Sequence, residues 1–251
     1  YLDAATNRSI YPKIQKAISA DPDLRYESPQ ALYSALKEVI ETTGRTHLRQ
    51  TIAVVGNHSG CGATHIAIAL VTTLNYLGIS AVYQEKNWSN DLRKTVAQLK
   101  HVWEKNGCFF YRNFTGFPKY DSGIEIPEPV AQIMVNDYGC DFSSSCLATA
   151  DHIIYVCGGA LWHRDDAKSK DFLLQNFGNR LHVVANLCDH NSAIYFARTF
   201  SQPVYSYPFN TDIFRADKEK LDFVHWLQQP EKGRNRLFLR FINHLFRLLQ
   251  P

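Results

Sequence analysis

The stretch of residues 51–77 constrains the fold more than any other part of the chain. It begins with the β-branched run Thr51–Val55, which is typical of a fully buried strand. Thr64 then opens an apolar helix of about three to four turns. Three glycines between them permit a tight turn: Gly56, Gly60 and Gly62. Backbone N–H groups at such a helix start form a positive concavity that suits a phosphate. The stretch therefore predicts a strand, a phosphate-type loop and a helix.

This loop departs from the nucleotide-binding sequence G-x-x-x-x-G-K-[ST] at the lysine. In that motif the lysine contacts the β- and γ-phosphates, and the hydroxyl coordinates Mg²⁺. Here Gly62 is followed by Ala63 and Thr64, so the hydroxyl is present and the lysine is absent. Loss of a well-placed transition-state charge costs several kcal/mol, so we expect no rapid ATP hydrolysis. The alternative is that the loop is only a tight β–α turn.

The loop resembles the deviant phosphate loop of the MinD/ParA family of P-loop ATPases, which reads K-G-G-x-G-K-T-T. Three residues match it: Gly60, Gly62 and Thr64. Ala63 replaces the general lysine, His58 replaces the signature lysine of the family, and Asn57 replaces the first glycine of G-x-x-x-x-G-K-[ST]. Both cationic groups that would offset the charge of a triphosphate are therefore missing.

Segments downstream extend the resemblance along most of residues 48–230. Gly78–Tyr83 is predicted to form a second buried strand, and Glu85 lies where the family often carries an acidic switch residue; the alternative is a solvated charge at a strand end. Ala131–Val135 is a predicted third strand, and the following Asp137 resembles a Walker B aspartate, which holds the Mg²⁺ shell through water. The alternative is that Asp137 only caps the next turn.

Three more strands complete the predicted sheet: His152–Cys157, Leu181–Leu187 and Pro203–Tyr207. In the family an asparagine after the fifth strand reads the nucleotide base, and Asn186 has that place here, although asparagine is also an ordinary strand terminator. Pro208 begins a segment similar to the loop that closes over the base. Apolar strands interleaved with helices predict an α/β fold, a mostly parallel sheet with helices on both faces. Its ligand crevice should lie at the carboxyl ends of the strands.

The resemblance implies a nucleotide site, with ATP and Mg²⁺ as its possible cofactors. Thr64 and Asp137 are the candidate metal ligands, and Asp137 would act on metal-bound water. The candidate cofactor-binding residues are Gly60, Gly62, Ala63, Thr64, His65, Asp137, Asn186 and Pro208.

The N-terminal part resembles a different family. Residues 14–40 are similar to the last helices of the C-lobe of a serine/threonine protein kinase, in which the arginine pairs with a buried glutamate. The matching residues are Asp21, Pro22, Arg25, Tyr26 and Ser28. This kinase-like segment has no glycine-rich ATP loop, H-R-D or D-F-G motif of its own. The alternative is an ordinary helical hairpin with a D-P turn.

Residues 234–250 combine phenylalanine and leucine on one helical face with arginine on the other. This pattern suits a helix lying on a membrane surface. The segment is too short and too charged to span a bilayer. A core helix, or a contact with another chain, would give the same pattern. We therefore predict a helical segment with linker at 1–46, a degenerate P-loop domain at 47–232 and an amphipathic basic tail at 233–251.

Composition limits the partners and the compartment. The net charge of +3 does not favour nucleic acid. Six cysteines without a C-x-x-C pair indicate free thiols in a reducing cytosol. Cys61 lies at a helix start, where the pKa of a thiol can be lowered, or it simply fills the loop. Residues 105–128 are rich in aromatic side chains and predict a β-rich excursion with most of them buried, or else an exposed partner surface.

These observations favour a regulatory or binding module, a P-loop domain with weak or no hydrolysis in a larger kinase-linked or membrane-associated assembly. We expect it in the cytoplasm, either free or peripheral at the inner membrane face, with a protein partner or a second copy of itself. One alternative is a slow nucleotide-dependent switch ATPase. Another is a structural scaffold docked to a membrane by its tail.

Overall fold

The computed structural model describes residues 50–120, 131–141, 147–159, 167–209 and 212–228, and residues 16–17, 19, 21, 23 and 25–35 near the start of the chain. The chain divides into two compact units, Tyr1–Leu48 and Arg49–Pro251, which are described separately. The predicted tail helix at 234–250 lies outside the described residues. Among the helices that are described, none is long and apolar enough to cross a membrane.

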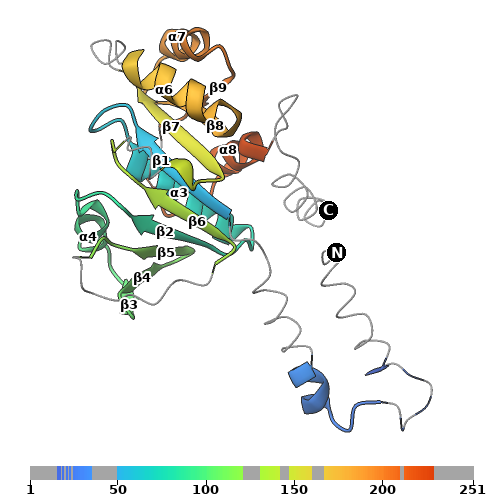
Figure 1. The fold of residues 1–251 in the computed structure, drawn as a ribbon. Helices are drawn as coiled ribbons and strands as arrows, with labels where there is room; N and C mark the ends of the chain where they lie inside the picture. Colours follow the sequence, from blue (N-terminus) through green and yellow to red (C-terminus); the bar gives the residue numbers. More distant parts are fainter. Residues whose placement is uncertain are drawn as a thin grey trace. The chain divides into compact units, whose positions relative to one another are not determined.

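The second unit is built on one nine-stranded sheet with the strand order β3-β4-β5-β2-β6-β1-β7-β8-β9 (Figure 1). The strands are β1 (Gln50–Gly56), β2 (Ala81–Glu85), β3 (Trp103–Lys105), β4 (Cys108–Tyr111), β5 (Phe114–Phe117), β6 (Ile133–Asp137), β7 (His152–Gly158), β8 (Leu181–Asn186) and β9 (Val204–Tyr207). The helices are α3 (Ala63–Tyr76), α4 (Asp91–Val96), α6 (Ala167–Phe177), the 3₁₀ turn η3 (Gly178–Arg180), α7 (His190–Phe200) and α8 (Lys218–Gln228).

The strands from β5 to β9 in this order all run parallel, and β3 and β4 are added antiparallel at one edge. β1 lies between β6 and β7 in the middle, which explains why its sequence is a continuous apolar run. The predicted fold class, a mostly parallel α/β sheet, is confirmed.

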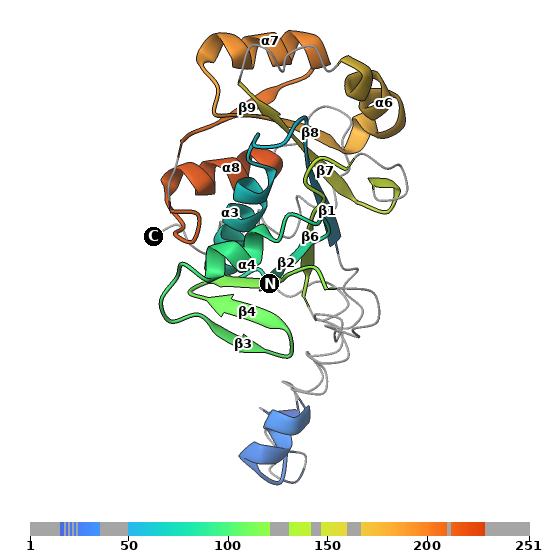
Figure 2. The ribbon, with the colours of Figure 1, turned by 90° about the vertical axis from the view of Figure 1, so that its left-hand side faces the viewer.

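Helices cover both faces of this sheet. The core on one face includes buried side chains of α3, α4 and α8, and the core on the other face includes those of α6 and α7. Figure 2 shows α3 and α8 together on one side of the central strands and α6 on the other. The carboxyl ends of the parallel strands are therefore left as the edge at which a ligand can reach the loops.

Two predicted strand boundaries are wrong. β2 begins at Ala81 rather than Gly78, because Gly78 has a φ of +79° and belongs to the turn that ends α3. The N–H of Ile79 donates to the carbonyl of Leu74 at 2.9 Å and closes that helix end. β6 continues to Asp137, so this carboxylate belongs to the strand itself.

The predicted β-rich excursion is confirmed up to residue 120 as the hairpins of β3, β4 and β5, and residues 121–128 lie outside the described residues. Phe109, Phe114 and Phe117 are buried, whereas Phe110 is half-buried and stacks on the exposed Trp103 with 4.1 Å between ring centroids. The antiparallel addition was not predicted, because the short strands are separated by turns that the aromatic pattern does not locate.

In the first unit, residues 29–35 are helical. Ser28 caps this helix, since its Oγ accepts a hydrogen bond from the N–H of Ala31 at 3.1 Å. The Nε of Arg25 donates to the carbonyl of Ser19 at 2.7 Å. Pro22 lies outside the described residues, and the kinase-like character of the segment stays a prediction.

Candidate phosphate-binding site

The loop between β1 and α3 lies at the carboxyl end of the central strand. Gly62 has a φ of 93° and stands at the N-cap of α3, where no side chain accepts a hydrogen bond from the first turn. That turn contains no acidic residue either. Because the first N–H groups of a helix have no partner within the helix, this turn offers donors and a positive dipole end to an anion. The local geometry is thus the one that the sequence predicts.

Two asparagines hold the loop in shape. The side-chain oxygen of Asn57 accepts a hydrogen bond from the N–H of Gly158 at 3.0 Å, and the amide nitrogen of Asn186 donates to the carbonyl of Cys61 at 2.8 Å. Sequence reasoning missed the first contact, since Asn57 drew notice only as a replacement for glycine. The amide nitrogen of Asn186 is bound to the loop, and base reading by this residue stays a prediction.

Close packing explains two further glycines around the loop. A Cβ atom on Gly56 would lie 2.2 Å from the Sγ of Cys61, and one on Gly158 would lie 2.4 Å from the Nε2 of His58. The His58 ring is also within hydrogen-bonding distance of the Ser59 carbonyl, with 2.7 Å between Nδ1 and that oxygen. His58, which replaces the signature lysine, therefore has its ring held against the backbone of the loop.

The carboxylate of Asp137 accepts three hydrogen bonds. Its Oδ2 accepts hydrogen bonds from the Thr64 hydroxyl at 2.6 Å and the Tyr83 hydroxyl at 2.8 Å. Its Oδ1 accepts one from the N–H of Gly139 at 2.9 Å. Asp137 is fully buried, which raises the pKa of its carboxyl group, and these hydrogen bonds oppose the rise. Asp137 therefore contacts Thr64 and also caps its own turn, and its role in holding a Mg²⁺ shell stays a prediction.

Glu85 is not the solvated strand-end charge that was one alternative. It is buried, and its carboxylate accepts hydrogen bonds from the N–H of Leu92 at 3.2 Å and the N–H of Lys119 at 3.3 Å. The backbone donors satisfy the carboxylate where water cannot reach it. Glu85 therefore fixes the segments that follow β2 and β5.

The remaining candidates lie around the end of β9. The His65 ring meets Tyr207 edge-on with 6.1 Å between ring centroids, and burial lowers the pKa of His65, with a smaller effect from the charge of Lys220. Pro208 follows the strand and is half-buried, and the next residue, Phe209, is 76% exposed.

Cys61 does not have the activated thiol that its place at a helix start allowed. It is buried, and burial raises the pKa of its thiol. Desolvation of the thiolate outweighs the nearby backbone N–H groups. The alternative, that Cys61 fills the loop, agrees with its packing against Gly56.

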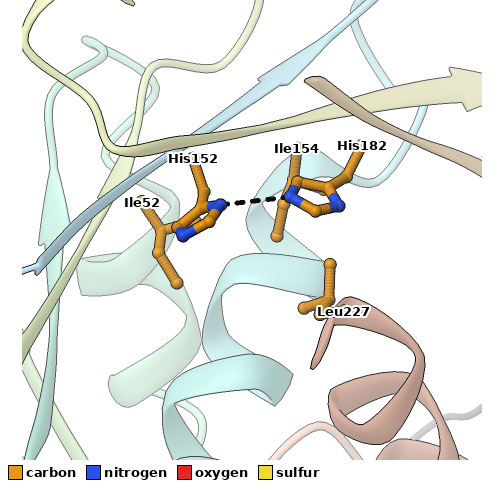
Figure 3. Close-up of a pocket in the computed structure, with 5 residues that line it drawn as sticks. All are labelled: Ile52, His152, Ile154, His182 and Leu227. Carbon is orange, nitrogen blue, oxygen red and sulfur yellow. Dashed lines mark hydrogen bonds between the residues drawn. The ribbon is translucent and has the colours of Figure 1, made fainter. Parts of the chain in front are cut away.

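A small cavity lies away from this loop, at the amino ends of β7 and β8. It measures about 10 Å³ and is lined by Ile52, His152, Ile154, His182 and Leu227 (Figure 3). His152 and His182 point toward one another in this view, with 3.2 Å between Nδ1 and Nε2. The volume is at the lower limit for one water molecule, so the cavity is a packing defect rather than a ligand site.

The residues predicted to hold Mg²⁺ lie side by side, but their carboxylate has little acceptor capacity left for metal-bound water. A carboxylate offers about four acceptor positions, and protein donors fill both positions on Oδ2 of Asp137 and one on Oδ1. A Walker-type aspartate needs an acceptor position for metal-bound water. Elsewhere in the described part of the chain, no cluster of three or more His, Cys, Asp or Glu side chains could hold a metal ion.

Substitution of Gly62 by alanine should destabilise the unit more than the same change at Gly60. Both glycines have a positive φ, 84° at Gly60 and 93° at Gly62, so each alanine is strained by about 1–2 kcal/mol. The new Cβ at Gly60 meets open space, whereas at Gly62 it would lie 2.2 Å from the Nδ2 of Asn186. We expect urea unfolding to show an additional loss of at least ~1 kcal/mol for Gly62→Ala. Equal losses for the two variants would contradict the contact with Asn186.

No protein-family model matches this chain, and no curated protein matches it. Among solved structures, it is similar to a ParA family ATPase from Chlorobium tepidum TLS, with 14% identity, a TM-score of 0.48 and coverage of 78% of this chain and 99% of that chain. A putative plasmid partition protein from Borrelia burgdorferi B31, bound to AMPPNP, gives 10% identity, a TM-score of 0.48 and coverage of 71% and 98%. The MinC:MinD cell division protein complex of Aquifex aeolicus gives 10% identity, a TM-score of 0.41 and coverage of 62% of this chain and 79% of that chain.

These similarities concern the general fold. The chain is structurally similar to ATPases of the ParA and MinD type at low sequence identity.

Proposed function

We propose that residues 50–228 form a regulatory module of the P-loop type that binds a phosphate-bearing ligand and hydrolyses nucleotides very slowly or not at all. One observation carries the proposal. The uncapped first turn of α3 adjoins a loop whose residues 56–65 include no lysine or arginine. Backbone donors suffice to bind a phosphate, but the transition state of phosphoryl transfer needs fixed positive charge that this loop lacks.

The module would work inside a larger assembly, with a protein partner or a second copy of the chain. The resemblance of residues 14–40 to a kinase C-lobe supports a kinase-linked assembly, and the basic amphipathic tail at 234–250 would suit a membrane surface.

Thermal unfolding with and without millimolar ATP, ADP or GTP tests the binding part. A ligand present at ~100 times its dissociation constant stabilises the folded state by about 2.7 kcal/mol, which raises the melting temperature by a few degrees. We expect such a shift for the wild-type chain and none for Gly62→Ala, whose loop is displaced. The absence of a shift with all three nucleotides would mean that the loop is only a β–α turn.

A slow nucleotide-dependent switch is the second candidate. The hydrogen bond between Thr64 and Asp137 favours it, because a Mg²⁺-dependent switch requires these two residues side by side. Such a switch would need its missing cation from a second copy of the chain. ATP turnover that rises more than linearly with protein concentration would support this candidate over the first.

A further inference from the structure

Tyr83 is a buried residue of β2 whose hydroxyl reaches the centre of the candidate site. Its side chain is fully buried, and its ring packs against Phe114 with 5.8 Å between centroids. The hydroxyl donates to the Oδ2 of Asp137 at 2.8 Å. A buried tyrosine hydroxyl needs a hydrogen-bond partner, and for Tyr83 that partner is Asp137.

The oxygen that Tyr83 contacts is the one that Thr64 also contacts. With Thr64 at 2.6 Å and Tyr83 at 2.8 Å, Oδ2 of Asp137 has both of its lone pairs engaged by protein donors. The N–H of Gly139 takes one position on Oδ1. Protein donors therefore fill three of about four acceptor positions of the carboxylate, both of those on Oδ2 among them, and leave one on Oδ1.

We propose that Tyr83 takes the place of metal-bound water on Asp137, so that the loop binds the phosphate group of its ligand without a divalent cation. This inference rests on the proposed function, because it specifies the form of ligand that the same loop accepts. The ligand class is a nucleotide or other phosphate compound free of Mg²⁺. Tyr83 is then the residue that separates this site from a Mg²⁺-dependent one.

The test compares ATP affinity in millimolar Mg²⁺ and in excess EDTA, by equilibrium dialysis, for the wild-type chain and for Tyr83→Phe. Phenylalanine keeps the ring against Phe114 and removes only the donor, so the variant should fold. We expect the wild-type dissociation constants in the two buffers to agree within about twofold. Tyr83→Phe, with an acceptor position on Oδ2 freed, should bind ATP at least ~10-fold more tightly in Mg²⁺ than in EDTA. Tyr111→Phe makes the same change on β4, whose Tyr111 ring packs on Phe214, and should behave like the wild type.

Each other outcome has a distinct meaning. Wild-type binding that requires Mg²⁺ would overturn this inference and leave the proposed function standing. Metal-independent binding by Tyr83→Phe would overturn it as well. If the wild type binds ATP in neither buffer, the proposed function fails; metal-dependent binding gained by Tyr83→Phe would then still support the role of Tyr83, and its absence would overturn that role.

Discussion

Substitution of Lys220 by methionine should lower the free energy of unfolding by about 3–5 kcal/mol. The Lys220 side chain is only 2% exposed. Its ammonium group donates three hydrogen bonds, to the Asp212 carbonyl at 2.7 Å, the Arg215 carbonyl at 2.7 Å and the Oδ2 of Asp217 at 2.8 Å. Methionine fills a similar volume but leaves these acceptors, two backbone carbonyls and the half-buried carboxylate of Asp217, without their donor. Chemical denaturation measures the loss.

The loss of stability should extend beyond Lys220 itself, because its hydrogen bonds hold the loop that precedes α8. Phe214 in this loop packs edge-on against Tyr111 and Phe114, with 5.0 and 5.2 Å between ring centroids. The matched control is Lys218→Met, at an exposed position of the same helix, which should change stability by less than ~0.5 kcal/mol. A loss below ~1 kcal/mol for Lys220→Met would contradict the structural role.

Replacement of Ala63 by lysine should strengthen ATP binding by about 10- to 100-fold. A charge-assisted hydrogen bond contributes about 1.5–3 kcal/mol, and each 1.4 kcal/mol is a factor of ten in affinity. Ala63 is the first residue of α3 and occupies the place of the general lysine of the P-loop motif. Isothermal titration with ATP measures the gain.

Two results would decide how the gain arises. Ala63→Met adds a side chain of similar length without charge, so it should give no gain if charge is what the loop lacks. Equal ATP affinity for Ala63→Lys and the wild type would contradict the placement of a phosphate against the first turn of α3.

Much of the fold could be predicted because its strands are marked by local composition. The runs that form β1, β7 and β8 are apolar and β-branched, and a strand buried on both faces must read in this way. The boundaries of β2 and β6 were misplaced. The turn at Gly78 and the pairing of β6 as far as Asp137 set these boundaries, and the local sequence marks neither. The antiparallel edge depends on pairing between short strands, which spacing does not show.

Only those residues of the candidate site that belong to a known sequence motif could be predicted. Thr64 and Asp137 meet as expected, across 73 residues of chain. The Tyr83 hydroxyl on Asp137 was missed, because a tyrosine within an apolar strand is indistinguishable from core. Lys220 was missed for the opposite reason, since a lysine in a helix rich in charged residues has the sequence signature of a solvated position. Such contacts arise from the fold and have no characteristic spacing in the sequence.

The central claim is that this loop retains a nucleotide without turning it over. The most direct measurement incubates the chain with ATP at the concentration that saturates its thermal shift, isolates the bound nucleotide by rapid gel filtration and identifies it by chromatography. We predict intact ATP, with turnover several orders of magnitude below the ~10 s⁻¹ typical of enzymes. ADP and phosphate formed at ~1 s⁻¹ or faster would contradict the claim. Recovery of the protein without any nucleotide would contradict it as well.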